Sequence, residues 1–396
     1  MNPEILRPWW SHRQGLDGRL DGASGQTVLA ETGWARSVGG VGPYFTLHSR
    51  AGIRRAEADA AVVNLEIHEL PTARGCTYVV PACDFAIGLA AGTSFREPEM
   101  RTAQKLGVTE AEIANLCEAI QVALEKGVLS PDEIRDATGS ASRSLGEEGK
   151  KKGLTTTLPI ALGRLQASGH IRRVPVDGRL DQQRYKYVLW RPNPLAGFSM
   201  TADEIHVELA RRYFSWIGPA TLAEFQWFSA LGVAAAKKAL VPLNLQPISA
   251  DSDRLILPEQ RDAFESFKPP NDADYRLISS LDGISLLRRD MRSMIDSQDS
   301  NRHVFYEKDF TKLDGLADLP NHAIVDRGRL VGLWEFDTFT QSIAWISFVP
   351  RNEDLVAAVE RMEAYVRDEL GDARSFSLDS PKSRISTIAA LRKESA

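Results

Sequence analysis

Cysteine and histidine are scarce in this chain, whose 396 residues include three cysteines and seven histidines. Six residues separate Cys76 from Cys83, and no histidine pair follows at ligand distance, so the spacing is not that of a zinc site. We therefore expect neither a bound metal nor a cofactor. Cys83 and Cys117 stand among small or apolar neighbours, and we expect both to be buried thiols.

Long apolar runs are also absent. No stretch of about 18 apolar residues occurs, which excludes a membrane-spanning helix. The first residues, MNPEILRPWW, lack the basic start and apolar core of a secretion signal, which favours a cytoplasmic protein with no membrane partner. A net charge of −5 argues against a protein that coats nucleic acid indiscriminately. The length and a 43% apolar content predict a folded chain of about two to four domains.

Positive charge is nevertheless concentrated in one segment. Between residues 143 and 191, eleven basic residues stand against four acidic ones, which leaves +7 within a chain of −5. Five of these bases fall in the stretch GHIRRVPVDGRLDQQRYKYVLW at 169–190. The segment is therefore a candidate phosphate-binding surface. The alternative is a solvated face whose charges pair with acids elsewhere in the chain.

The order of elements around this segment is typical of a winged helix-turn-helix. The residues SPDE at 130–133 form the signature of a helix N-terminus with a capping box. Apolar residues at helical spacing predict a second helix over 156–168. Two strands are then predicted over 171–176 and 184–190, with an Asp-Gly turn between them.

The same order of helices and a closing hairpin occurs twice more. Strands are predicted around 67–70 and 77–80 near the N-terminus, and around 245–248 and 254–257 in a third unit. We therefore predict three tandem winged helices. Beyond the polar joint FKPPNDADY, short alternating strands and a helix over 354–370 predict a small β-barrel or a sheet with a covering helix. The predicted units of this α+β fold are residues 1–95, 96–196, 197–268 and 269–396.

Basic and hydroxyl side chains of the second unit are the candidate DNA contacts, because Lys and Arg neutralise phosphates and threonine hydroxyls donate hydrogen bonds to them. With Arg74 of the first hairpin, the candidates are Lys150, Lys151, Lys152, Thr155, Thr156, Thr157, Arg164, Arg172, Arg173, Arg179, Arg184 and Lys186.

Aromatic residues allow two interpretations. Trp9 and Trp10, beside basic residues, are either stacking platforms for bases or the core face of the first helix. Trp227 and Phe228 are predicted to lie in the core. One buried cluster is predicted in the third unit, made of Phe214, Trp216, Leu222, Phe225 and Leu231.

Three motifs together resemble a known family. They are RQGL at 13–16, RGCTYVVPACDF at 74–85 and ARRYFSWIGPATLAEFQWFSALGVAAAKKAL at 210–240. They resemble the winged-helix DNA-binding proteins that include the AlkZ- and YcaQ-type DNA glycosylases, which unhook interstrand crosslinks and excise bulky alkylated bases. The resemblance implies three winged helices in a C-shape with a C-terminal β-barrel, holding duplex DNA in the concave channel. It also implies a hairpin, here around His68 to Tyr78, that reaches toward a damaged base.

One departure from the family pattern concerns catalysis. The active glycosylases carry Gln-x-Gln or Gln-x-Asp before the helix that begins at Pro43-Tyr44 in this chain, and those side chains position or activate water at the sugar carbon. The motif maps onto Arg36-Ser37-Val38 or Gly42-Pro43-Tyr44, and neither stretch contains Gln, Asp or Glu. The family's catalytic assignment therefore does not transfer to these positions. The candidates for a replacement are Glu69, His48, Gln14 and Tyr44, with His68 on the same hairpin, and each of them has a structural role as the alternative.

Three functions remain open from the sequence. The first, which we favour, is a DNA-binding protein of this family without base-excision activity. The second is a glycosylase with a rearranged active site that acts on alkylated or crosslinked bases. The third is an interaction module whose winged helices contact protein. For the first two, the partner is double-stranded DNA, and we expect a monomer that is associated with the nucleoid when bound to DNA.

Overall fold

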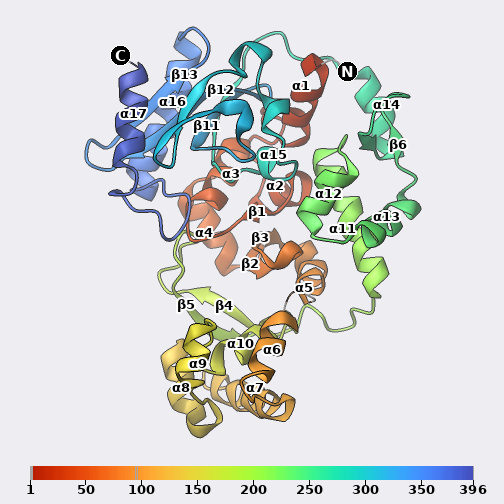
Figure 1. The fold of residues 1–396 in the computed structure, drawn as a ribbon, viewed down its shortest axis with the longest axis vertical. Coiled ribbons are helices and arrows are strands. Elements are labelled where there is room, and N and C mark those ends of the chain that lie inside the picture. Colours follow the sequence, from red (N-terminus) through yellow and green to blue (C-terminus); the bar gives the residue numbers. More distant parts are fainter. Residues whose placement is uncertain (1–2, 94, 96, 396) are drawn as a thin grey trace.

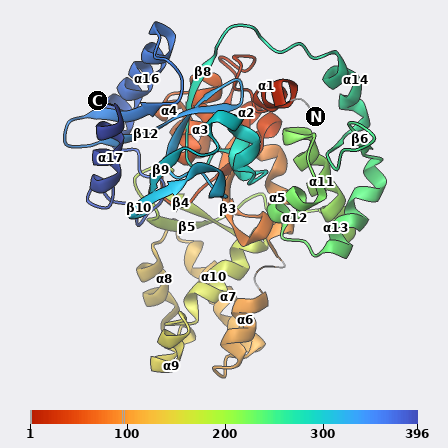
Figure 2. The ribbon, with the colours of Figure 1, turned by 45° about the horizontal axis from the view of Figure 1, so that its top comes forward.

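Helices and small antiparallel sheets alternate along the chain in the computed structural model, which describes residues 3–93, 95 and 97–395 (Figure 1). The boundary predicted between residues 95 and 96 touches residues 94 and 96, which lie outside this range. The N-terminal part occupies the centre, between the C-terminal sheet and the third helical unit, while the second unit projects from the rest (Figure 2). No helix of the described residues is long and apolar enough to cross a membrane.

The N-terminal part combines helices with a three-stranded sheet in the order β1-β3-β2. Its helices are α1 (Pro3–Arg13), α2 (Gly25–Thr32), α3 (Gly42–Ala51), α4 (Arg55–Val63) and α5 (Phe85–Thr93), and its strands are β1 (Ala35–Arg36), β2 (Ile67–Pro71) and β3 (Thr77–Pro81). The predicted hairpin is confirmed as β2 and β3, joined by a short 3-10 turn at Ala73–Gly75. Trp9 and Trp10 are buried in the core, which decides between their two interpretations.

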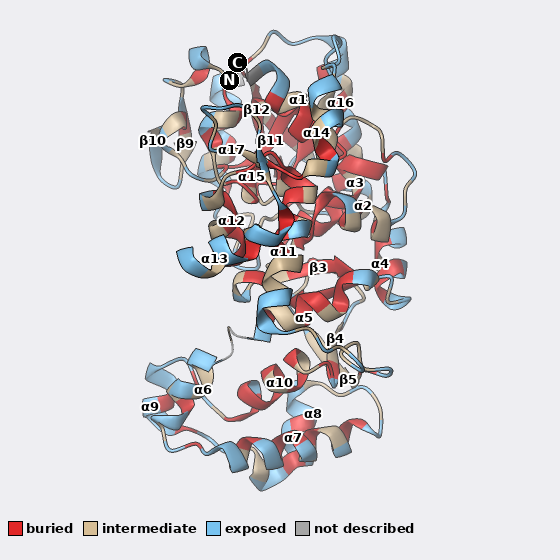
Figure 3. Ribbon diagram, turned by 90° about the vertical axis from the view of Figure 1, so that its right-hand side faces the viewer, coloured by how far each residue is buried: buried red, intermediate tan, exposed pale blue. Residues whose placement is uncertain are grey.

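The second unit has a small core of its own, separate from the larger body (Figure 3). Its elements are α6 (Glu97–Gln104), α7 (Glu110–Leu124), α8 (Pro131–Thr138), α9 (Gly146–Lys151), α10 (Leu158–Ala167), β4 (Ile171–Pro175) and β5 (Tyr185–Leu189). The capping box at Ser130 is present, and α10 lies within the predicted helix over 156–168. The long loop between β4 and β5 turns back onto the body, where Leu180 is buried in the core formed with α3 and α16 (Glu353–Tyr365).

The third unit consists of three helices, a very short hairpin and a last helix. These are α11 (Ala202–Ile217), α12 (Leu222–Ser229), α13 (Val233–Leu240), β6 (Gln246–Pro247), β7 (Leu255–Ile256) and α14 (Pro258–Ser266). Thr201 and Thr221 start α11 and α12 with complete capping boxes. The predicted cluster is confirmed, because Phe214, Trp216 and Phe225 are buried in one core and the two leucines pack at its edge.

The C-terminal part is built on an open four-stranded antiparallel sheet in the order β13-β12-β11-β8. Its elements are β8 (Tyr275–Ile278), α15 (Gly283–Leu286), β9 (His303–Tyr306), β10 (Asp309–Lys312), β11 (His322–Asp326), β12 (Arg329–Asp337), β13 (Ser342–Ser347), α16 and α17 (Ile385–Ser395). Of the two predicted alternatives, the β-barrel, which the family resemblance also implied, is wrong for the described residues. The other alternative, a sheet with a covering helix, is found, with α3 and α16 in the core of one face and α17 in that of the other.

Two predictions of burial are corrected by the structure. Trp227 is only half-buried, because it borders a pocket, whereas its neighbour Phe228 lies in the core as predicted. Cys83 is exposed, while Cys117 is buried. Helices followed by a hairpin occur in the predicted order in all three units, but their arrangement as three tandem winged helices in a C-shape stays a prediction.

Candidate nucleic-acid interface

The N-terminal sheet presents two faces with different neighbours. Side chains alternate along a strand, so Arg36 and Tyr78 point to one face, whereas Ser37 and Glu69 point to the other. The first face borders α12 and α15, which come from the third unit and the C-terminal part. The second face meets the basic hairpin β4–β5, where Arg173 approaches Glu69.

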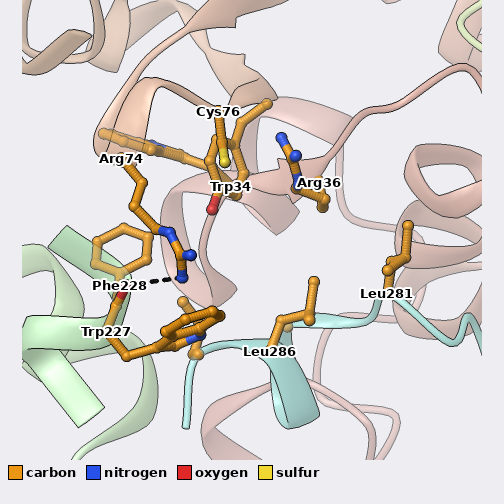
Figure 4. Close-up of a pocket in the computed structure, with 11 residues that line it drawn as sticks. Trp34, Arg36, Arg74, Cys76, Trp227, Phe228, Leu281 and Leu286 are labelled. Atoms are coloured by element: carbon orange, nitrogen blue, oxygen red, sulfur yellow. Dashed lines mark hydrogen bonds between the residues drawn. The ribbon is translucent and has the colours of Figure 1, made fainter. Parts of the chain in front are cut away.

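On the first face lies a pocket with a cavity volume of about 160 Å³ (Figure 4). A cavity of about 150 Å³ admits a benzene-sized ring, so this pocket has room for a flat aromatic group. Its lining consists of Trp34, Arg36, Arg74, Cys76, Tyr78, Trp227, Phe228, Leu281, Gly283, Leu286 and Leu287. None of these residues has a carboxylate or amide side chain. The lining is therefore aromatic, aliphatic and cationic.

Two arginines lie over the ring of Trp227. The guanidinium carbon of Arg74 lies 3.3 Å from the ring centre, and its Nη1 donates a hydrogen bond of 3.2 Å to the backbone carbonyl of Trp227. The guanidinium carbon of Arg289 lies 4.0 Å from the same ring centre. Both arginines have a left-handed backbone, with φ of 64° and 51°, which is uncommon for residues other than glycine. Such a conformation persists only where the surroundings hold it, as they do at many binding sites.

A third arginine, Arg36, completes the cationic side of the pocket. Its Nη1 donates a hydrogen bond of 2.8 Å to the backbone carbonyl of Thr77, and its guanidinium carbon lies 5.4 Å from the ring centre of Tyr78. Burial raises the pKa of Tyr78 to about 12, so its hydroxyl stays neutral at physiological pH. When the family motif is placed on 36–38, Arg36 stands at its first position.

Glu69, the carboxylate that flanks the first hairpin, does not reach this pocket. It is buried on the opposite face of the sheet, where it accepts a hydrogen bond of 2.5 Å from the hydroxyl of Ser37. Arg173 lies 3.8 Å from its other oxygen and 4.5 Å from the ring centre of Tyr185. The carboxylate thus joins the first hairpin to the second one.

Gln14 is fully buried and its side-chain amide is fully engaged. Its nitrogen donates to the backbone carbonyls of Thr32 and Trp216, at 2.6 and 3.0 Å, and its oxygen accepts from Arg50 at 3.0 Å. Arg50 in turn forms a buried ion pair of 2.8 Å with Asp282. This network supports the loop before α15 and leaves no polar atom of Gln14 for water activation.

Tyr44 and His48 lie on α3, away from the pocket. The hydroxyl of Tyr44 donates to Asp59 and accepts a hydrogen bond of 2.9 Å from the backbone nitrogen of Leu180. The ring of His48 is stacked on Tyr365 with ring centres 3.7 Å apart, and burial lowers its pKa. These contacts hold the β4–β5 loop and α16 against α3.

His68 is the remaining polar candidate and it is completely buried. Its ring lies against Trp190 and Phe85, and neither ring nitrogen has a hydrogen-bond partner among the described residues. Burial, helped by the charges of Arg172 and Arg173, lowers its pKa to about 3. His68 is therefore a neutral, packed side chain at physiological pH.

The basic residues of the second unit divide into paired and unpaired groups. Arg164, Lys150 and Lys151 form ion pairs of 2.6–2.7 Å with Glu110, Glu147 and Glu148, and Arg143 and Arg191 pair with Glu112 and Glu125. Arg179 pairs with Asp181 within the β4–β5 loop. Within the basic segment 143–191, the Lys and Arg residues without an ion pair among those described are Lys152, Arg172, Arg184 and Lys186. Part of the positive charge is thus neutralised by acids outside the segment, which was the alternative interpretation.

A small part of the basic segment meets the first hairpin across a larger groove. Its cavity volume is about 550 Å³, and its lining includes Thr77, Arg135, Thr156 and Arg173. Thr157 is buried and its hydroxyl accepts a hydrogen bond of 3.2 Å from the backbone nitrogen of Arg143, while Thr155 is exposed. Only Thr156 and Arg173 of the predicted DNA contacts therefore line this groove, and Arg74 lines the smaller pocket.

Sequence reasoning missed Trp34, Arg36 and Arg289 as residues around the pocket. Arg289 lies far from the other two along the chain, and no local pattern links them. The proximity of Arg36 to the family motif was the one available signal. No group of three or more His, Cys, Asp or Glu residues that could hold a metal occurs among the described residues.

Comparisons with known proteins agree on one family. The model of the family described as "DNA glycosylase AlkZ-like" matches residues 40–376. The solved structure of Streptomyces sahachiroi DNA glycosylase AlkZ is similar with a TM-score of 0.68 and 20% sequence identity, covering 95% of this chain and 98% of that one. No curated protein matches. Because the family model spans most of the sequence, the chain belongs to the AlkZ-like DNA glycosylase family, for which DNA is the partner.

Proposed function

We propose that the protein binds double-stranded DNA as a monomer and takes one extrahelical base into the pocket beside Trp227, without the usual glycosylase hydrolysis. The observation that carries the proposal is the lining of that pocket, which offers aromatic faces and guanidinium groups but no carboxylate or amide. Proteins that extrude a base stack it between aromatic or apolar side chains and read its edge with hydrogen bonds. Arg36 and Arg74 are the donors available here.

In this proposal, DNA is contacted at two places, the basic side chains of the second unit and the pocket beside Trp227. Lys152, Arg184 and Lys186, which have no ion pair among the described residues, supply positive charge for phosphates. A groove lies between the second unit and the first hairpin, whose tip residue Arg74 lines the pocket. A protein bound in this way would be found in the nucleoid.

The same lining supports the part of the proposal that concerns glycosylase chemistry. Hydrolysis of an N-glycosidic bond needs a polar group that orients water and stabilises the positive charge developing on the sugar. With the family motif placed on 36–38, Arg36 brings a positive charge to the position of the motif's first polar side chain, which opposes a reaction that develops positive charge on the sugar.

A glycosylase with a rearranged site is the second candidate. The observation that favours it is Glu69, a buried carboxylate on the same sheet, whose second oxygen lies 3.8 Å from Arg173. Base release would then require the sugar to reach the face of the sheet that is opposite to the pocket.

The proposal is tested by comparing a fully paired duplex with the same duplex carrying one mismatch. A mismatched base costs less to extrude, so we expect tighter binding of the mismatched duplex. Trp227→Ala should remove this preference and leave binding of the paired duplex intact. Trp345→Ala is the matched control, because Trp345 is also half-buried and stacked by an arginine, Arg351 at 4.3 Å, but lies on β13. No binding of either duplex, or no effect of Trp227→Ala on the preference, would refute the proposal.

A further inference from the structure

We infer that the pocket supports an alkyl transfer: the thiol of Cys76 accepts an alkyl group from an exocyclic oxygen of a base, and the hydroxyl of Tyr78 protonates the base that is expelled. The substrate class is a DNA base alkylated at oxygen, for example O6-alkylguanine. The inference rests on the proposed function, because the base must first enter the pocket. The reaction leaves the N-glycosidic bond intact and restores the base.

The two side chains share one face of the first hairpin. Both line the cavity, and the sulfur of Cys76 points into it (Figure 4). Cys76 stands directly before β3 with an extended backbone, at φ −86° and ψ 153°. Residues two apart in an extended chain point to the same side and lie roughly 7 Å from each other. A base in the pocket is therefore within reach of the thiol and the hydroxyl together.

The hydroxyl of Tyr78 lacks a partner, although the residue is only 9% exposed. No hydrogen bond of this hydroxyl occurs among the described residues. Its oxygen is not fully enclosed, so its open side is the cavity that the ring lines. Polar groups at such depth are nearly always hydrogen-bonded. The free hydroxyl is therefore a position that a ligand in the cavity would satisfy.

The surroundings of Cys76 are those in which thiols react. Cys76 is partly exposed, and Arg36 and Arg74 line the same cavity with hydrogen bonds to backbone carbonyls but no ion pair among the described residues. The thiolate is the nucleophile, and reactive cysteines are found in electropositive, partly exposed surroundings. Cys83 differs, since burial and the neighbouring charge of Asp84 raise the pKa of its thiol.

The transfer balances without an oxidant or a reductant. The thiolate sulfur attacks the saturated carbon of the alkyl group, so that a carbon–sulfur bond forms and the carbon–oxygen bond breaks. The electron pair of the broken bond stays on the base, which takes a proton from Tyr78. The tyrosinate recovers a proton from water, which has received the thiol proton. In total, the alkyl group moves to sulfur and one proton moves to the base.

Tyr78 is suited to this proton transfer. Burial raises its pKa to about 12, so the hydroxyl is protonated at neutral pH. The charges of Arg36 and Arg74 act against burial and favour the tyrosinate. They therefore stabilise the anion that remains after the proton has moved. A general acid of this kind contributes a factor of about 10² to 10⁴ in rate.

The test incubates the full-length protein with an excess of a duplex that carries one O6-methylguanine and follows the intact mass of the protein with time. We expect a gain of one methylene group, which peptide mapping places on Cys76, and guanine without abasic sites in the product DNA. Cys76→Ser should abolish the transfer. Cys83→Ser is the matched control, since Cys83 is the exposed cysteine, and it should react like the unmodified protein. Tyr78→Phe should slow the transfer about a hundredfold and leave Tm and duplex affinity unchanged.

The outcomes separate the two proposals. If the duplex does not bind, the proposed function fails. If it binds but Cys76 gains no methyl group, the DNA-binding function stands and the inference is wrong. Methylation of Cys83 as fast as that of Cys76 would show ordinary thiol reactivity and would also overturn the inference, as would an unchanged rate in Tyr78→Phe for the proton donor. The mass and the position of the label are measured on the unmodified protein, so poor folding of a variant does not prevent a decision.

Discussion

Arg74 lies over the ring of Trp227, with its guanidinium carbon 3.3 Å from the ring centre, and donates a hydrogen bond to the backbone carbonyl of the same residue. The contact joins the tip of the first hairpin to α12, which are 153 positions apart. It also explains why Trp227 is not a core residue. One face of its indole is used by Arg74, and Arg289 lies close to the same ring.

The two tryptophans of the third unit should differ in their contribution to stability. Trp216→Ala removes a side chain that is 1% exposed and surrounded by Trp34 and Phe228, so we expect a loss of about 3–5 kcal/mol. Trp227→Ala should cost clearly less, because the residue is half-buried at a pocket. Urea unfolding of both variants measures the difference. Equal losses would show that the ring of Trp227 is part of the core in solution.

Lysine and arginine side chains of the second unit that form no ion pair should matter more for DNA binding than those that form one. Lys152→Ser, Arg184→Ser and Lys186→Ser together should weaken all duplexes alike and reduce the slope of log affinity against log salt by about 0.9 for each phosphate that is no longer neutralised. Lys150→Ser and Lys151→Ser are the matched controls, since both lysines pair with glutamates of α9. A salt titration of binding checks this. If the controls have the larger effect, the binding face lies on α9.

Base excision should be absent or very slow in the unmodified protein. The loss of one positioned polar group costs about a hundredfold to a thousandfold in rate. We therefore expect no measurable abasic sites in DNA containing 7-methylguanine or nitrogen-mustard crosslinks, while DNA binding persists. Robust release would contradict this. The variant Glu69→Gln would then show whether the buried carboxylate replaces the missing motif.

Stability should depend on pH through His68. Burial lowers the pKa of His68 to about 3 in the folded protein, whereas the unfolded value is near 6.5. Between these values the unfolded chain binds a proton that the folded chain does not, so stability falls as pH falls, by up to about 1.4 kcal/mol per pH unit. His68→Phe should flatten this dependence and raise stability at pH 5, because both ring nitrogens lack a partner among the described residues. Urea unfolding at pH 5 and pH 7 measures it, and an unchanged slope would contradict the assignment.

Local signals predicted the elements well. The capping box at Ser130, the strands of the first two hairpins and the aromatic cluster of α11 and α12 all follow from spacings of a few residues. The sequence did not decide between a β-barrel and a sheet with a covering helix, because closure depends on pairing between edge strands and no short pattern encodes it. β13 and β8 remain the edges of an open sheet.

The candidate site was harder to predict for a related reason. Charge counting along residues 143–191 ignored acids such as Glu110 and Glu125, which lie outside the segment but pair with it. The pocket depends on residues from the first hairpin, α12 and α15, which only the tertiary fold brings together. From the sequence alone, a half-buried tryptophan is not distinguished from a core residue, because an arginine that lies over its ring leaves no periodic pattern.

The loop between β4 and β5 has a mechanical consequence. Leu180 is buried in the core of the body, its backbone nitrogen is held by Tyr44, and Arg374 bonds the carbonyl of Asp181. A long surface loop is normally where proteases cut first. This one is a tether: cleaving it requires the body to open, and while it holds, the second unit cannot swing away from the rest of the molecule without breaking that core.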